Sequence, residues 1–163
     1  MSHLIATFFY VGHLKPAPGT WGSLAALPLA LVLSLLGGPF LVLLAVVLAF
    51  GAGLWATREE TRDSPDSDPG HIVIDEVAGQ LTALLPVVFG AWSVGASVTA
   101  LWPGWLAAFA LFRLFDIWKP WLVGRADRMH GPMGVMLDDM IAGAFAALGV
   151  VVVAAIAHLP VIL

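Results

Sequence analysis

Residues 73–79 read VIDEVAG and residues 135–143 read VMLDDMIAG, and each stretch places two adjacent carboxylates where a long apolar segment begins. Apolar residues dominate the chain: 60% of its 163 residues are hydrophobic and only 11% are charged, and the mean hydropathy is +0.95. Soluble domains average about 25% charged residues. The composition therefore predicts a membrane protein, in which paired acids need an explanation.

The charged residues are confined to Lys15, to 58–76 and to 113–139. These three charged islands leave the rest of the chain uncharged. A net charge of -4 without any basic run argues against a nucleic-acid partner. Because the chain has no cysteine, a disulfide framework, a thiolate metal site and a cysteine nucleophile are all excluded.

The uncharged stretches predict about five membrane-crossing helices in one domain, residues 1–163. The turn signal at 37–39 divides residues 21–57 into segments of about 16 and 19 residues that form a hairpin. The first spans only about 24 Å against a hydrocarbon core of about 30 Å, so whether it crosses stays open. Residues 77–112 predict a second hairpin with a tryptophan-rich turn, and 140–163 predict a last helix. The expected fold is an all-α polytopic membrane bundle.

The charge distribution also predicts an orientation. If every segment crosses, the three charged islands lie on one face of the membrane, and the turn at 37–39 lies on the other with the tryptophan-rich turn. Every Lys and Arg is then on one side, which the positive-inside rule assigns to the cytoplasm. The first twenty residues lack the features of a removable signal peptide, so none is expected.

The two acid pairs share a second feature, a glycine four residues after one acid of each pair. Gly79 follows Asp75 and Gly143 follows Asp139 at this spacing, which places each glycine on the helix face of its acid and allows close helix approach. We expect Asp75 and Asp139 to point inward. The simpler alternative is that acids in a first helical turn only compensate the helix dipole.

Converging carboxylates repel one another unless protons or a cation relieve the repulsion. A metal site made of carboxylate oxygens, with no cysteine ligand, favours Mg²⁺ or Mn²⁺ over zinc. We therefore predict a site for Mg²⁺ or Mn²⁺ at the cytoplasmic interface. The predicted metal ligands are Asp75, Glu76, Asp138 and Asp139. The predicted catalytic residues are these four together with Asp116.

Basic and hydroxyl residues near the acids are candidates for binding a phosphate. In FRLFDIWKP (112–120), Arg113, Asp116 and Lys119 are spaced three apart; they form either a surface ion-pair ladder or a phosphate site in which Asp116 completes the metal set. KPAPGTWGS (15–23) leads into a helix, with Thr20 and Ser23 as possible N-caps or phosphate ligands. His130 is the remaining candidate, in the expected loop 124–134.

Three histidines, His13, His71 and His130, lie on the charged side, where any of them could act as general acid or base. A bystander or capping role is the simpler interpretation for each. His3 and His158 are expected to be bystanders. The DSD motif at 66–68 is expected to be loop.

The motifs PAPGTWGSLAA, HIVIDEVAGQ and FRLFDIWKPW…GRADRMHGPMGVMLDDMIAG together resemble the phosphatidylglycerophosphatase A family over residues 12–147. The resemblance implies a bacterial inner-membrane, Mg²⁺-dependent enzyme that hydrolyses phosphatidylglycerophosphate to phosphatidylglycerol and inorganic phosphate. It places the family's acidic signature on the five predicted catalytic acids, with Arg113 and Lys119 beside them. Leu122 and Pro132 depart from the family pattern, and Pro132 weakens any role for that loop's backbone in holding phosphate.

Two alternatives to this activity stay open. One is a phosphatase acting on another membrane lipid monophosphate. The other is a divalent-cation transporter, because acids in membrane segments often mark ion paths. Acids near mid-bilayer would favour the transporter, whereas acids gathered at one interface favour the enzyme.

Overall fold

The computed structural model describes residues 1–64, 66 and 68–162, which form helices and loops without a β-strand among them. In chain order the elements are α1 (Ser2–Ala6), η1 (Val11–His13), α2 (Pro18–Glu60), α3 (Ile74–Ser93), η2 (Val98–Leu101), α4 (Trp102–Trp118), α5 (Leu122–Asp127) and α6 (Pro132–Ile162). Within these residues, α2, α3, η2 with α4, and α6 are long and apolar enough to cross a membrane. The predicted all-α membrane bundle is confirmed.

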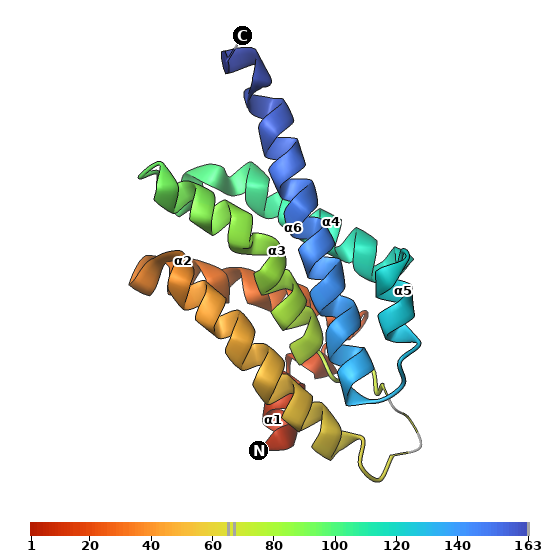
Figure 1. Ribbon diagram of the computed structural model, residues 1–163. Coiled ribbons are helices and arrows are strands. Elements are labelled where there is room, and N and C mark those ends of the chain that lie inside the picture. Colours follow the sequence, from red (N-terminus) through yellow and green to blue (C-terminus); the bar gives the residue numbers. More distant parts are fainter. Residues whose placement is uncertain (65, 67, 163) are drawn as a thin grey trace.

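Helix α2 consists of two arms joined by a sharp turn. Gly37 and Gly38 have non-helical backbone, and Gly38 lies in the left-handed region at φ 65°, where glycine has no steric penalty. Pro39 follows, and proline is well tolerated in the first turn of a helix. Figure 1 shows the arms as a hairpin with its turn at the edge of the bundle. The first arm begins at Pro18 rather than at residue 21, so it is longer than the sequence predicts.

Helix α3 is the central helix of the bundle. It packs against α2, α4 and α6, and its side chains include the fully buried Leu81 and Leu84. The surrounding helices expose large apolar side chains instead, among them Leu36 on α2, Leu106 on α4 and Val152 on α6. Lipid tails can cover such a surface at no cost, so this pattern fits a membrane bundle.

Helices α3 and α4 form the predicted second hairpin. Helix α3 ends at Ser93 and α4 begins at Trp102, with η2 in the connection. The indole N–H of Trp105 donates to the Val98 carbonyl at 3.0 Å, which fixes the turn against α4. Trp92 and Trp102 remain exposed there, as expected at a membrane interface.

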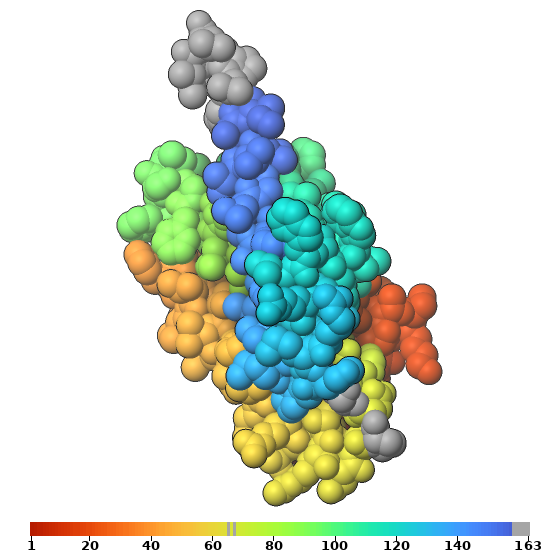
Figure 2. Space-filling model, turned by 45° about the vertical axis from the view of Figure 1, so that its right-hand side comes forward, coloured from red at the N-terminus to blue at the C-terminus, as the bar shows by residue number. Residues whose placement is uncertain are grey.

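The charged segments gather at one end of the molecule. Figure 1 shows α1, the loop after α2, α5 and the start of α6 at this end, whereas the α2 turn, the α3–α4 turn and the end of α6 lie away from it. The space-filling view in Figure 2 shows α5 in front of the first part of α6. The polar end is therefore where a charged substrate can meet the bundle.

Three local predictions were wrong. Helix α6 begins at Pro132 rather than near residue 140, because proline fits the first helical position, where its missing N–H costs nothing. The expected loop at 124–134 is instead the end of α5, a short loop and the start of α6. Thr20 and Ser23 are not N-caps, since Ala17 is the N-cap of α2 and both residues lie inside the helix.

Candidate active site

A glycine contact between α3 and α6 brings acids from the two pairs together. A Cβ on Gly143 would overlap the backbone carbonyl of Gly79, and a Cβ on Gly79 would lie 2.6 Å from the backbone oxygen of Asp139. The helices can touch at this point only because both residues lack a side chain. Asp75 lies one turn before Gly79 and Asp139 one turn before Gly143, so the close contact draws these acids into one place.

Three carboxylates converge at this contact. One oxygen each from Asp75, Glu76 and Asp139 lies within 4.8 Å of the other two. Asp75 and Asp139 are only 6% and 4% exposed, and the buried Oε2 of Glu76 has no hydrogen-bond partner among the described residues. We call these three residues the carboxylate triad. Their mutual repulsion and the unpaired oxygen fit a hard divalent cation held by oxygen ligands.

Asp138, the fourth predicted metal ligand, is not part of the carboxylate triad. Its Oδ2 accepts a hydrogen bond from the Lys119 ammonium at 2.9 Å, and Lys119 also donates to Asp127. Burial by itself lowers the pKa of Lys119, but the hydrogen bonds to the two carboxylates outweigh this and raise it above the ordinary value. Lys119 thus joins the end of α4 to α5 and α6, and the adjacent acids of α6 face different partners.

Arg113 lies beside the carboxylate triad with one donor unused. Its Nη1 forms an ion pair with Asp116 at 2.6 Å and reaches the Ser23 hydroxyl at 3.5 Å. Its buried Nε has no hydrogen-bond partner among the described residues. Asp116 is in turn an electrostatic neighbour of Asp139 and Glu76. This guanidinium group can therefore bind an anion while it holds Asp116 next to the triad.

The start of α2 forms another wall of the site. A Cβ on Gly19 would overlap Glu76 Oε1 and lie 3.4 Å from Arg113 Nη1, so glycine is needed for the helix N-terminus to approach these groups. Ser23 donates to the Gly19 carbonyl at 2.9 Å. Thr20 is half-buried in the same turn. Pro18 has no N–H, and the N–H groups of Thr20 and Trp21 donate to the Ala17 carbonyl, so this wall offers a phosphate mainly the positive end of the helix dipole.

His130 lies apart from the triad, exposed in the loop before α6. With Asp127 and Asp138 it lines a small cavity next to the Lys119 hydrogen bonds. Asp68 lines the same cavity and interacts electrostatically with Lys119. Asp68 does lie in a loop, as expected, but its position beside this cavity was missed, because a loop has no periodicity that would relate Asp68 to Asp75. The part of the DSD motif at residue 67 lies outside the described residues.

Comparison with known proteins identifies the family of the chain. The family profile for phosphatidylglycerophosphatase A matches residues 4–154. The chain belongs to the phosphatidylglycerophosphatase A family. It is therefore a lipid phosphatase, and the resemblance found in the sequence motifs is confirmed.

Three relatives from bacteria match most of the chain. The phosphatidylglycerophosphatase A of Haemophilus influenzae is 39% identical over 148 residues, covering 90% of this chain and 84% of the relative. That of Escherichia coli is 36% identical over 147 residues, covering 89% and 78%. A Bacteroides thetaiotaomicron protein named as a candidate phosphatidylinositol-3-phosphatase is 38% identical over 150 residues, covering 87% and 86%. No solved structure matches the chain.

Proposed function

We propose that this phosphatase hydrolyses phosphatidylglycerophosphate to phosphatidylglycerol and inorganic phosphate, using Mg²⁺ held by Asp75, Glu76 and Asp139. The convergence of three carboxylates beside Arg113, two of them on buried residues and one on the half-buried Glu76, carries the proposal. The names of the Haemophilus influenzae and Escherichia coli relatives support the choice of substrate. Family membership favours an enzyme over the cation transporter.

The bundle suits a substrate that has acyl tails and a charged headgroup. The exposed apolar faces of α2, α4 and α6 keep the protein and the tails in the bilayer, while the phosphomonoester reaches the charged end. Arg113 has an unused N–H for a phosphate oxygen, and the start of α2 faces the same place. These groups bind and orient the phosphate, and they stabilise negative charge as the phosphoryl group is transferred.

In the reaction a water oxygen forms a bond to phosphorus, and the bond from phosphorus to the lipid oxygen breaks. Asp75, Glu76 and Asp139 would hold Mg²⁺, which would neutralise charge on the phosphate and make water a better nucleophile. We assign Asp116 to accept the water proton, because Arg113 holds it beside Asp139. Asp116 then releases its proton to solvent, and the departing lipid oxygen takes up a proton from solvent and becomes the free hydroxyl of phosphatidylglycerol. Lys119 acts mainly by holding Asp138 in place, because its ammonium group already donates hydrogen bonds to Asp127 and Asp138.

We also propose that the protein lies in a bacterial inner membrane with its active site on the cytoplasmic side. All Lys and Arg residues lie in the three charged islands, which the positive-inside rule places on that side. The bacterial origin of the three relatives agrees with this location.

The test of the substrate uses protein purified in detergent micelles and three lipids that each carry a phosphomonoester: phosphatidylglycerophosphate, phosphatidic acid and phosphatidylinositol 3-phosphate. We expect phosphate release to be fastest from phosphatidylglycerophosphate, to stop with EDTA and to return with Mg²⁺. Faster release from phosphatidylinositol 3-phosphate would instead support the alternative function, a phosphatase of that lipid, which the name of the Bacteroides relative favours. Equal rates with and without EDTA would reject the proposed metal.

A further inference from the structure

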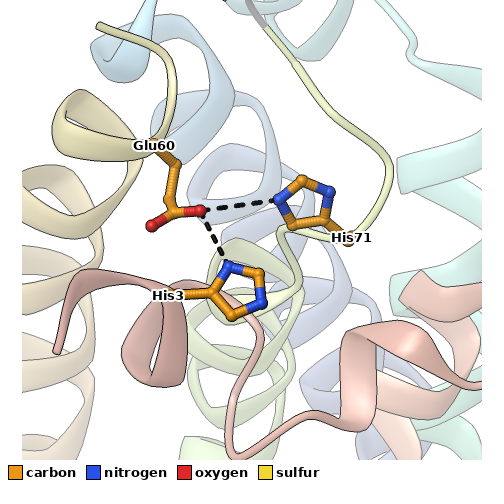
Figure 3. A group of neighbouring side chains, drawn as sticks. All are labelled: His3, Glu60 and His71. Carbon is orange, nitrogen blue, oxygen red and sulfur yellow. Dashed lines mark hydrogen bonds and ion pairs between the residues drawn. The ribbon is translucent and has the colours of Figure 1, made fainter.

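A second group of ionisable side chains lies at the charged end, outside the carboxylate triad. It consists of His3 on α1, His13 in η1, Glu60 at the end of α2 and His71 in the loop before α3. Figure 3 shows His3, Glu60 and His71 pointing toward one another from separate segments of the chain. None of these four residues has a part in the proposed hydrolysis, so the group needs an explanation of its own.

Three atoms of this group are spaced like metal ligands. His3 Nδ1 lies 2.9 Å from Glu60 Oε2, His71 Nε2 lies 3.7 Å from the same oxygen, and ligand atoms of all three residues lie within 4.8 Å of one another. Two ligands of a tetrahedral zinc ion, each bonded at about 2.0–2.1 Å, are roughly 3.3 Å apart. The observed separations lie on either side of this value, so small side-chain rotations would complete the site.

The surroundings of His71 and Glu60 also indicate a missing partner. His71 Nε2 is buried and has no hydrogen bond among the described residues. The Glu60 side chain is only 16% exposed, and its Oε2 atom is shared between two histidines. A buried polar nitrogen without a hydrogen bond is costly, and a cation bound between the three residues would remove that cost.

His13 completes the arrangement from the other side of His3. The Nε2 atoms of His3 and His13 are 3.0 Å apart, so the ring nitrogen of His3 that faces away from Glu60 has a hydrogen-bonding partner. Metal-bound histidines commonly use their second nitrogen in this way, which fixes the ring and its tautomer. The ring centroids of His3, His13 and His71 are 5.2 to 5.8 Å apart, so the three imidazoles form one compact group.

We propose that His3 Nδ1, Glu60 Oε2 and His71 Nε2 bind a divalent transition-metal ion such as Zn²⁺, with His13 as the hydrogen-bonding support of His3. Two imidazoles and one carboxylate suit zinc, unlike the all-oxygen triad, which suits Mg²⁺. The ion would clamp the N-terminal segment to the end of α2 and to the segment that leads into Asp75. A backbone hydrogen bond from Val73 to Ala6, at 2.9 Å, already joins two of these segments.

The test is Co²⁺ binding, measured by visible absorption on metal-free protein that carries a C-terminal tag without histidine. We expect one Co²⁺ per chain with the strong absorption of a tetrahedral nitrogen-ligated ion, displaced by Zn²⁺ and unaffected by excess Mg²⁺. The variants His3→Ala and Glu60→Gln should each weaken binding at least about 10-fold. Zn²⁺ should also raise the melting temperature of the wild type and leave that of these variants unchanged.

Two controls separate this site from the others. The exposed His130 lies outside the group, so His130→Ala should bind Co²⁺ like the wild type. Asp139→Asn removes a residue of the carboxylate triad and should also keep the Co²⁺ signal, so loss of hydrolysis and loss of this site can be told apart. Equal Co²⁺ binding in His3→Ala, Glu60→Gln and the wild type would overturn the proposal. Absence of tetrahedral absorption in the folded wild type would also overturn it.

Discussion

Gly19 shows how much the site depends on one missing side chain. A methyl group there would overlap Glu76 Oε1, the free end of a flexible side chain, rather than backbone. In Gly19→Ala we therefore expect Glu76 to swing away while the fold survives. Phosphate release should fall on the order of 100-fold, because displacing a catalytic group by about 1 Å has effects of that size. The measurement is the rate on phosphatidylglycerophosphate together with the melting temperature.

The matched control for this variant is Gly51→Ala in the second arm of the same helix. Nothing lies within 4 Å of a Cβ at Gly51, so this variant should keep its activity and melt no lower than the wild type. Full activity in Gly19→Ala would mean that Glu76 is not needed where the structure places it.

Lys119 gives a prediction about pH. Its pKa is raised above the ordinary 10.5, since the hydrogen bonds to Asp127 and Asp138 outweigh burial, which acts the other way. A raised pKa in the folded state adds stability that is complete below the unfolded pKa and is lost as the pH rises through the folded pKa. We expect the melting-temperature difference between wild type and Lys119→Met to stay constant from about pH 7 to pH 10 and to shrink above that range.

The control for Lys119 is Arg125→Met, which removes an exposed cation from α5. Its effect on the melting temperature should be small and should not change with pH over the same range, since exposed charges contribute little. If the melting-temperature difference between the wild type and Lys119→Met stayed the same above pH 11, the charge of Lys119 would not stabilise the fold.

At the scale of single residues, the sequence identified the acids but not all of their partners. The glycine spacing correctly brought Asp75 and Asp139 together, because helical periodicity determines which residues share a face. The same spacing singled out Asp139 over Asp138 as the inward acid, but it could not show that Asp138 pairs with Lys119, because that partner comes from another part of the chain. His3 was expected to be a bystander, because the residues near it in space, Glu60 and His71, are far away in the sequence.

Among the elements, the contact between α3 and α6 controls the geometry of the site. In Gly79→Ala the new Cβ would lie 2.5 Å from a ring carbon of Phe112 and 2.6 Å from the Asp139 backbone oxygen. The helices must then move apart, so we expect a destabilisation of about 1–3 kcal/mol and a large loss of activity. Both can be measured in detergent micelles, by equilibrium unfolding and by phosphate release.

Gly90→Ala, near the other end of the same helix, is the control for this substitution. Nothing lies within 4 Å of a Cβ there, so it should leave activity unchanged and stabilise α3 by about 0.5–1 kcal/mol. If Gly79→Ala and Gly90→Ala had the same activity and stability, the close approach of α3 and α6 would not be what positions the acids of the carboxylate triad.

The helices themselves could be predicted well, because apolar length and the glycine turn at 37–38 are local signals. The start of α6 could not be predicted, because Pro132 in HGPMG is equally consistent with a loop and with a first helical turn. Helix α5 has only six residues, too short for a periodic pattern.

At the scale of the whole molecule, the orientation can be tested with engineered cysteines, because the chain has none of its own. Asp63→Cys lies in the exposed loop after α2, and Ala96→Cys lies in the exposed turn between α3 and α4. With a membrane-impermeant maleimide on intact bacterial cells, we expect Ala96→Cys to be labelled and Asp63→Cys to react only after lysis. The reverse pattern would place the site outside the cytoplasm.

The central claim is that folding gathers Asp75, Glu76 and Asp139 into a Mg²⁺ site for phosphate hydrolysis. Its most direct test is a Mg²⁺ titration of phosphate release from phosphatidylglycerophosphate by the wild type, by Asp139→Asn and by Asp63→Asn, which changes an exposed loop acid. We predict that the wild type and Asp63→Asn share one Mg²⁺ dependence, while folded Asp139→Asn loses about 100-fold or more at saturating Mg²⁺. A folded Asp139→Asn with the rate and Mg²⁺ dependence of the wild type would contradict the claim.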